Sequence, residues 1–143
     1  MIQTVKSIRF CVHGAPVGKA RPRVTKSGHA YTPQKTKDYE AIVRACYQSQ
    51  VGRGRFPAGV PLTVKITAEF PIPKSTGKKR AAALLGRWHT KKPDADNVAK
   101  AILDALNGVA YPDDSAVARL VVEKTYSDQP CVMVAIVGEI PEP

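Results

Sequence analysis

Residues 94–126 read DADNVAKAILDALNGVAYPDDSAVARLVVEKTY and predict a helix, a tight turn and a strand in succession. At about 100° per residue, the apolar side chains of Val98, Ile102 and Leu106 share one arc with their apolar neighbours, which predicts an amphipathic helix over Asp96–Asn107. Gly108 is suited to the position just past the helix, and the turn YPDDS follows it. The apolar arc of such a helix is expected to pack on a sheet.

The remaining chain supplies the strands of that sheet and a second helix. A helix without Gly or Pro is predicted over residues 34–51, and a short helical turn over residues 81–85. A basic loop or irregular hairpin is expected between the first strand and the first helix. The predicted strands are Ser7–His13, Leu62–Phe70, Val117–Tyr126 and Cys131–Ile140, the last of them apolar enough to be central. The order β-α-β-α-β-β predicts a single α+β domain over residues 1–143, with two main helices packed on a mixed sheet.

The charges of the chain are divided between its two parts. Residues 1–92 hold 19 Lys and Arg against three acidic residues, whereas residues 93–143 hold three Lys and Arg against nine acidic residues. The net charge of +10 favours contact with polyanions, nucleic acid above all, although basic proteins without such a partner are common. A solvated surface without a function usually mixes the two signs more evenly.

The cysteines and the hydropathy of the chain bear on where the protein works. The three cysteines are odd in number, far apart and lack the spacing of a zinc site, so we expect free thiols. No signal peptide is recognisable at the start of the chain, and no apolar run approaches the roughly 18 residues of a membrane helix. We therefore expect a soluble protein of the cytoplasm.

Five of the seven aspartates lie in the short acidic segment that begins at residue 94. They are Asp94, Asp96, Asp104, Asp113 and Asp114. Each has an ordinary explanation as a helix cap, a first-turn residue, a partner of a nearby lysine or a turn residue. Taken together they favour another explanation, because carboxylates that face phosphate repel it unless a cation lies between them.

A divalent metal ion would reconcile these carboxylates with a polyanionic substrate. Mg²⁺ takes one or two carboxylates together with water and substrate phosphate, and it can polarise a phosphoryl group. Lys100 lies one helical turn beyond Asp96, where it could neutralise developing charge or orient water. The residue types therefore favour metal-dependent cleavage of a phosphodiester, while a non-catalytic DNA-binding module with capping aspartates stays open.

The residues from Pro93 to Lys100, followed by DALNG at 104–108 and by Asp113-Asp114, closely resemble the RusA family of Holliday-junction resolvases. The basic stretch GKARPRVTKSGHAYTP at residues 18–33 is similar to one branch of that family. The resemblance implies a homodimeric, Mg²⁺-dependent endonuclease that makes paired nicks in four-way DNA junctions. Mn²⁺ is expected to substitute for Mg²⁺, and such proteins are frequently carried by prophages.

The resemblance also assigns roles to single residues. It implies that Asp94, Asp96 and Asp114 are catalytic metal ligands and that Lys100 is the catalytic lysine. Asp113 is a further candidate ligand. Asn97 and Asp104 match the pattern as supporting residues that orient the ligands or the lysine. Selection of four-way junctions over other branched DNA is a matter of shape that the sequence does not display, so a nuclease acting on other branched DNA stays open.

Basic residues outside this segment are candidates for contact with the DNA backbone. Trp88 is expected to pack against the fold rather than to stack on a ligand. The DNA-contact candidates are Lys19, Arg21, Arg23, Lys26, Lys78, Lys79, Arg80, Lys91, Lys92 and Lys124.

Overall fold

Four long strands form one mixed sheet in the spatial order β1-β6-β4-β5 in the computed structural model, which describes residues 3–141. The neighbours β1/β6 and β6/β4 are antiparallel, and β4/β5 are parallel. The predicted central position of the last strand is confirmed, since β6 lies between β1 and β4. The strands are β1 (Gln3–His13), β4 (Leu62–Pro71), β5 (Val117–Ser127) and β6 (Cys131–Pro141).

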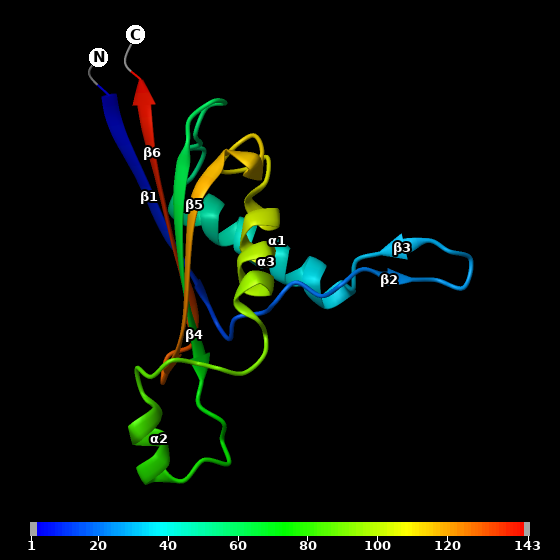
Figure 1. The fold of residues 1–143 in the computed structure, drawn as a ribbon, viewed down its shortest axis with the longest axis vertical. Coiled ribbons are helices and arrows are strands. Elements are labelled where there is room, and N and C mark those ends of the chain that lie inside the picture. The colour runs from blue at the N-terminus through cyan, green and yellow to red at the C-terminus, as the bar shows by residue number, and fades with distance from the viewer. Residues whose placement is uncertain (1–2, 142–143) are drawn as a thin grey trace.

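Two helices cover one face of the sheet, α1 (Gln34–Gln50) and α3 (Ala95–Leu106), and both lie on the same side of it in Figure 1. The α3 helix buries Val98, Ile102 and Leu106, the arc that its sequence predicts. The α1 helix buries Val43 and Tyr47 against the same core. The predicted α+β fold with two main helices on a mixed sheet is confirmed.

The α3 helix begins and ends where its sequence indicates. Asp94 is the N-cap residue, and its backbone carbonyl accepts a hydrogen bond from the Val98 amide at 3.0 Å. Gly108 follows the C-cap with φ +76°, a conformation that favours glycine. The buried Tyr111 hydroxyl donates to the Leu103 carbonyl at 2.8 Å, which satisfies one of the last carbonyls of the helix.

Several boundaries and one side chain differ from the sequence prediction. The first strand begins at Gln3 rather than at residue 7, because it pairs with β6 along its whole length. The helical turn expected over residues 81–85 is the helix α2 (Lys78–Leu84), which buries no residue and therefore shows no amphipathic pattern. The basic loop contains a short hairpin of β2 (Arg23–Val24) and β3 (Ala30–Tyr31).

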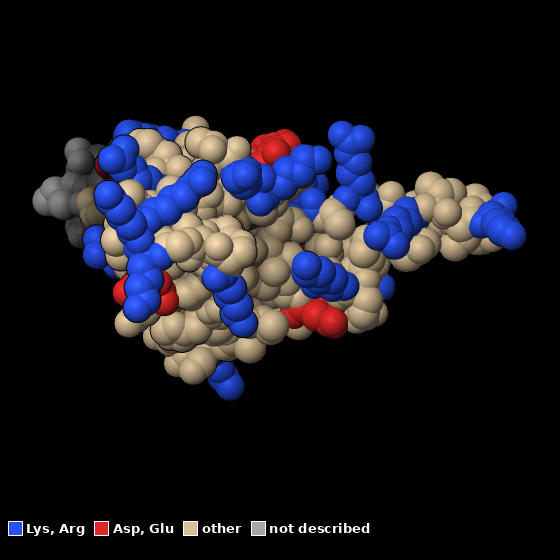
Figure 2. Space-filling model, turned by 90° about the horizontal axis from the view of Figure 1, so that it is seen from below, with Lys and Arg blue, Asp and Glu red and all other residues tan. Residues whose placement is uncertain are grey.

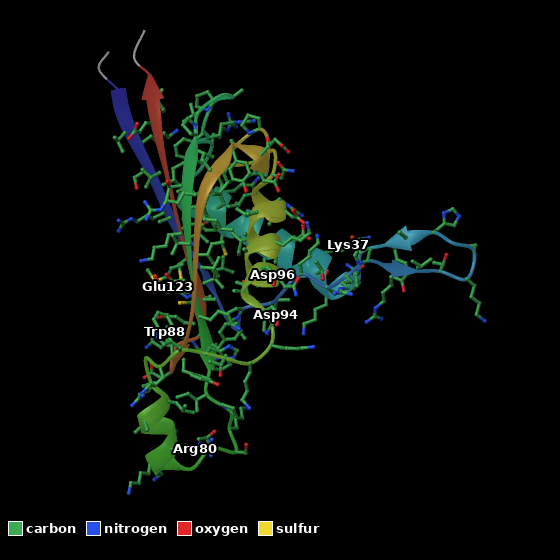
Figure 3. All side chains as sticks on the ribbon, viewed as in Figure 1. Lys37, Arg80, Trp88, Asp94, Asp96 and Glu123 are labelled. Carbon is green, nitrogen blue, oxygen red and sulfur yellow. The ribbon has the colours of Figure 1, made fainter. Side chains whose placement is uncertain are left out.

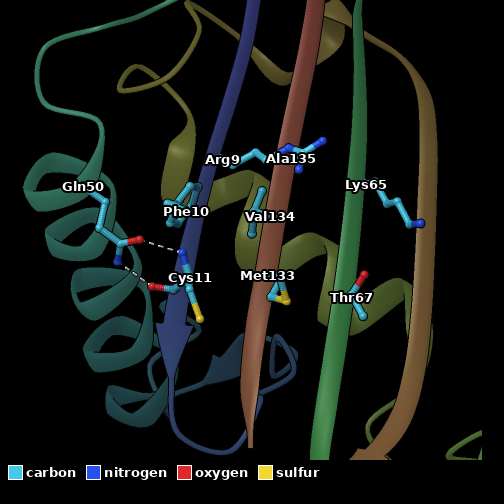
Figure 4. A pocket seen from close by; sticks show the side chains of 9 residues that line it. All are labelled: Arg9, Phe10, Cys11, Gln50, Lys65, Thr67, Met133, Val134 and Ala135. Carbon is cyan, nitrogen blue, oxygen red and sulfur yellow. Dashed lines mark hydrogen bonds between the residues drawn. The ribbon is translucent and has the colours of Figure 1, made fainter. Parts of the chain in front are cut away.

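Within residues 3–141, no helix covers the opposite face of the sheet. Val5 and Met133 are exposed there, and a groove of about 460 Å³ runs over the strands beside them (Figure 4). At its edge the Gln50 side chain bonds both the amide and the carbonyl of Cys11, at 2.8 and 2.7 Å, and fixes the end of α1 to β1. All three cysteines are free thiols, as expected. Over the described residues, every helix is too short or too polar to span a membrane.

Candidate active site

The basic loop is fastened to the start of α3 at its root. The Lys19 amide donates to the Asn97 carbonyl at 2.8 Å, and the Ala20 amide donates to the buried Thr36 hydroxyl at 3.3 Å. Gly18 packs so closely that a Cβ atom there would lie 2.5 Å from the Cβ of Pro93. This part of the loop therefore holds the segment that leads into α3, while all residues from Arg21 to Tyr31 are exposed.

The Lys19 ammonium group lies between two carboxylates inside the protein. It is 2.6 Å from Glu40 Oε1 and 3.2 Å from Asp104 Oδ2, and its side chain is only 14% exposed. Burial lowers the pKa of Lys19, but the hydrogen bonds and charges of the two carboxylates outweigh it and leave the pKa above its usual value. In the structure the charge of Lys19 joins the loop to α1 and α3, and the contact with DNA predicted for Lys19 stays a prediction.

Asp104 connects this buried pair to Lys100. Its Oδ2 atom is 4.0 Å from the Lys100 ammonium as well as 3.2 Å from that of Lys19. The Lys100 side chain is 63% exposed, so its ammonium can reach a ligand. Asp104 thus lies beside Lys100, and the supporting role predicted for it stays a prediction.

Asp94 and Asp96 lie at the N-terminus of α3, both exposed (Figure 3). Two residues apart, their Cα atoms are separated by at most about 7 Å. The Asp94 side chain makes no capping hydrogen bond. Neither carboxylate has an ion pair within residues 3–141. Helix capping therefore does not engage these carboxylates, and both are free to bind a ligand.

Asp113 and Asp114 lie at the other end of α3. Asp113 accepts a hydrogen bond from the Ser115 amide at 3.2 Å, and hydrogen bonds from Ser115 and from Asn107, the C-cap residue of α3, lower its pKa. Burial raises the pKa of Tyr111, and the nearby charges of Asp114, Asp104 and Asp113 raise it further.

The pair Asp94 and Asp96 and the pair Asp113 and Asp114 therefore lie toward opposite ends of α3. The 12 residues of α3 span about 18 Å. Across the described part of the chain, no three His, Cys, Asp or Glu side chains are grouped so that they could hold a metal ion. One protomer brings together Asp94 and Asp96, and it does not bring Asp113 or Asp114 to them.

A basic groove opens beside Asp94. It has a volume of about 780 Å³, and Arg21, Arg23, Lys35 and Lys92 line it together with Asp94. Lys35 was missed in the sequence, although the basic first turn of α1, which also holds Lys37, was a visible signal. The groove is large enough for an extended anionic chain to pass the Asp94 carboxylate.

Further cations are spread over the molecule on both sides of this groove. Lys26 lies in the exposed hairpin, and Lys78, Lys79 and Arg80 are exposed on α2. Figure 2 shows one face on which Lys and Arg side chains extend from the body of the protein to the projecting hairpin, with few acidic side chains among them. Such a surface attracts a nucleic-acid backbone over a long path.

Lys124 fixes the segment that leads to Asp94. Its ammonium donates to the Lys91 carbonyl at 2.7 Å, and it lies near the Phe70 ring. His89 stacks on Phe70 with ring centroids 3.8 Å apart, and burial lowers its pKa, with smaller effects from Lys124 and Lys91. The contact found for Lys124 is thus within the protein, whereas the Lys91 and Lys92 side chains are exposed.

Comparison with known proteins identifies the family. Residues 13–137, most of the chain, match the family described as "Endodeoxyribonuclease RusA". The chain belongs to the RusA endodeoxyribonuclease family. It is also 39% identical over 136 residues to "Uncharacterized protein YqaN" of Bacillus subtilis (strain 168), which covers 90% of this chain and 94% of that protein. Because the RusA family consists of endodeoxyribonucleases that act on branched DNA, the carboxylates and the basic groove described above form the candidate active site.

Proposed function

We propose that this RusA-family protein is a Mg²⁺-dependent endonuclease that resolves four-way DNA junctions by paired nicks. The observation that carries the proposal is the free carboxylate pair Asp94 and Asp96, of which Asp94 lines a basic groove, with the exposed Lys100 one helical turn beyond Asp96. A surface whose only task is to bind DNA has no use for two unpaired carboxylates beside the phosphate path, because they repel phosphate.

The residues at the N-terminus of α3 suit a hard divalent cation. Mg²⁺ is commonly held by one or two carboxylates, with substrate phosphate and water completing its coordination. We assign this role to Asp94 and Asp96, with Asp114 as a third ligand and Asp113 as an alternate one. A bound Mg²⁺ or Mn²⁺ supplies a positive charge that polarises the scissile phosphate.

The protein's own residues would position and stabilise the reacting group. Arg21, Arg23 and Lys92 hold the DNA backbone in the groove, and the projecting hairpin extends the contact along a duplex. Lys100 places a positive charge where negative charge develops on the phosphate. Asp104, shared between Lys100 and Lys19, limits the directions that the Lys100 side chain can take.

A second copy of the chain would complete the site. Within one protomer, Asp94 and Asp96 lie at the N-terminus of α3 and Asp114 follows its C-terminus, and the helix between them is about 18 Å long. A two-fold axis roughly perpendicular to α3 places the N-terminus of one α3 beside the C-terminus of the other, and it does so twice. We propose a homodimer with two equivalent sites, each combining Asp94 and Asp96 of one protomer with Asp114 of its partner. Two sites held by one dimer also suit symmetric nicks in opposed strands.

The substrate and the free thiols suggest where the protein acts. DNA junctions arise where DNA recombines, and free cysteines are typical of a reducing compartment. We propose that the protein works on DNA in the cytoplasm, in recombination and repair.

The test is a cleavage assay on a labelled four-way junction and a matched linear duplex, with and without Mg²⁺. We expect symmetric nicks in the junction only, dependent on the metal and absent in Asp96→Asn. Equal cutting of flaps or three-way branches would replace the junction assignment with a general branched-DNA nuclease. If no substrate is cut and the wild type and Asp96→Asn bind DNA equally, the protein is a DNA-binding module in which the aspartates have structural roles.

A further inference from the structure

Trp88 is exposed, contrary to the packing role predicted for it. The residue is 65% accessible, and it is the single tryptophan of the chain. Tryptophan is usually well buried, because its large ring gains more than other side chains from leaving water. An exposed indole is therefore informative when the structure around it is well fixed.

The backbone on both sides of Trp88 is held to β5. The His89 amide donates to the Lys124 carbonyl at 2.8 Å, and the Tyr126 amide donates to the Arg87 carbonyl at 3.0 Å. Trp88 itself pairs with Thr125 in an isolated antiparallel bridge. The indole is thus presented from a short extension of the sheet rather than from a loose loop, and its exposure is built into the fold.

The surroundings of Trp88 are basic and polar. Residues 71–93 contain seven Lys and Arg and no carboxylate. A hollow of about 460 Å³ lies against Trp88, with Arg80, Lys91, Thr76 and Thr90 on its walls. Its volume is in the range of sites that hold small organic groups, about 300–1,000 Å³. An aromatic ring, hydroxyl donors and cations without any acid match a nucleotide, which offers an aromatic base and a phosphate.

We propose that Trp88 is a stacking platform for an unpaired nucleobase at the branch point of the DNA substrate. The inference rests on the proposed function, since it requires bound branched DNA. Six residues separate Trp88 from Asp94, a distance of at most about 20 Å, or about six nucleotides of one strand. Figure 3 shows Trp88 and Asp94 on the segment that joins α2 to α3, with Asp94 at the end that enters α3. The Trp88 indole can therefore reach a base near the cut. Because the bases of a fully paired duplex are covered by their neighbours, stacking of the indole on an unpaired base distinguishes a branch point from a duplex.

The single tryptophan allows a direct test by intrinsic fluorescence. The Asp96→Asn protein, which is expected not to cut, is titrated in Mg²⁺ with a four-way junction and with a linear duplex of matched sequence. We expect the junction to quench the tryptophan emission and to protect it from iodide, and the duplex to do neither at equal occupancy. Occupancy is measured separately by the anisotropy of labelled DNA.

Variants connect the emission change to binding. Trp88→Ala is expected to bind the junction about tenfold more weakly and the duplex with unchanged affinity. Trp88→Phe should keep most of the junction affinity, because phenylalanine also stacks. Leu85→Ala removes another exposed apolar side chain of the same segment, 47% accessible, and is expected to bind like the wild type.

Three outcomes would overturn the proposal. One is unchanged emission when the junction is saturating by anisotropy, and another is equal junction affinity of Trp88→Ala and the wild type. The third is an emission that changes with protein concentration in the absence of DNA, which would make Trp88 part of a contact between copies of the chain. These are binding measurements, so they stand apart from the cleavage assay, and loss of cutting with intact junction binding would contradict the proposed nuclease function alone.

Discussion

Lys19→Met tests the internal ion network that joins the basic loop to both helices. The substitution keeps most of the side-chain volume and removes the charge that lies 2.6 Å from Glu40 and 3.2 Å from Asp104. Two carboxylates are then left facing each other with little water around them. We expect a loss of stability and a weaker attachment of the loop to α3.

The size of the effect follows from the burial of the three groups. Removing one partner of a fully buried ion pair costs about 3–5 kcal/mol. Here the side chains are 13–26% exposed, and water can partly solvate the carboxylates that remain. We therefore expect a loss of about 2–3 kcal/mol, roughly the worth of one hydrogen bond to a charged group. For a chain of this size that corresponds to a fall in Tm of about 4–12 °C.

The assay is thermal unfolding at neutral pH with a matched control. Lys26→Met removes an exposed lysine from the hairpin of the same loop and is expected to leave Tm within about 1 °C. The double variant Lys19→Met/Glu40→Gln should recover part of the loss, since one of the two repelling charges is gone. If Lys19→Met unfolds at the wild-type temperature, the network does not hold the loop and the role given to Lys19 is refuted.

Three further predictions follow from close contacts and from one partly buried ring, that of His89. Gly18→Ala should lower the rate of junction cutting by more than its effect on Tm would explain, because a Cβ atom 2.5 Å from Pro93 Cβ displaces the segment that precedes the catalytic helix. A cutting rate equal to that of the wild type would show that this contact is not needed. Gly138→Ala should cost about 1–3 kcal/mol in denaturant unfolding, since its Cβ would lie 2.8 Å from the Phe56 ring in the core, and unchanged stability would contradict the packing. Because the pKa of His89 is lowered in the folded protein, the unfolded chain binds the proton at a higher pH, and stability should fall as pH drops from about 6.5 through the folded-state pKa. His89→Phe should remove this contribution to the pH dependence of stability between about pH 7 and 5. An identical pH dependence in both proteins would exclude His89 as its source.

The elements with strong periodicity were predictable from the sequence. The α3 helix and the apolar strand β6 show patterns set by burial on one or both faces, and their bounds came within two residues of the structure. The α2 helix buries nothing, so no apolar pattern marks it. Trp88 was mispredicted because the residue type indicates only the average burial of tryptophan. The exposure of this particular ring depends on how its segment pairs with β5, which the sequence does not show.

The site was predictable in its residue types and less so in its arrangement. The pattern of aspartates marked Asp94 and Asp96, which the structure leaves free at one helix end. The partners of Lys19 come from α1 and α3, at separations of 21 and 85 residues, and no local pattern connects them. The tight turn after α3 leaves Asp113 and Asp114 toward the C-terminal end of the helix instead of returning them along it, and no local pattern predicts this.

The most direct test of the proposed shared site is complementation between two inactive variants. Asp96→Asn and Asp114→Asn are co-expressed with different tags, and the mixed dimer is purified and incubated with a labelled four-way junction and Mg²⁺. If each site combines carboxylates of two protomers, the mixed dimer keeps one intact site and nicks one strand per junction, while both parent proteins stay inactive. A mixed dimer as inactive as its parents would contradict the shared site.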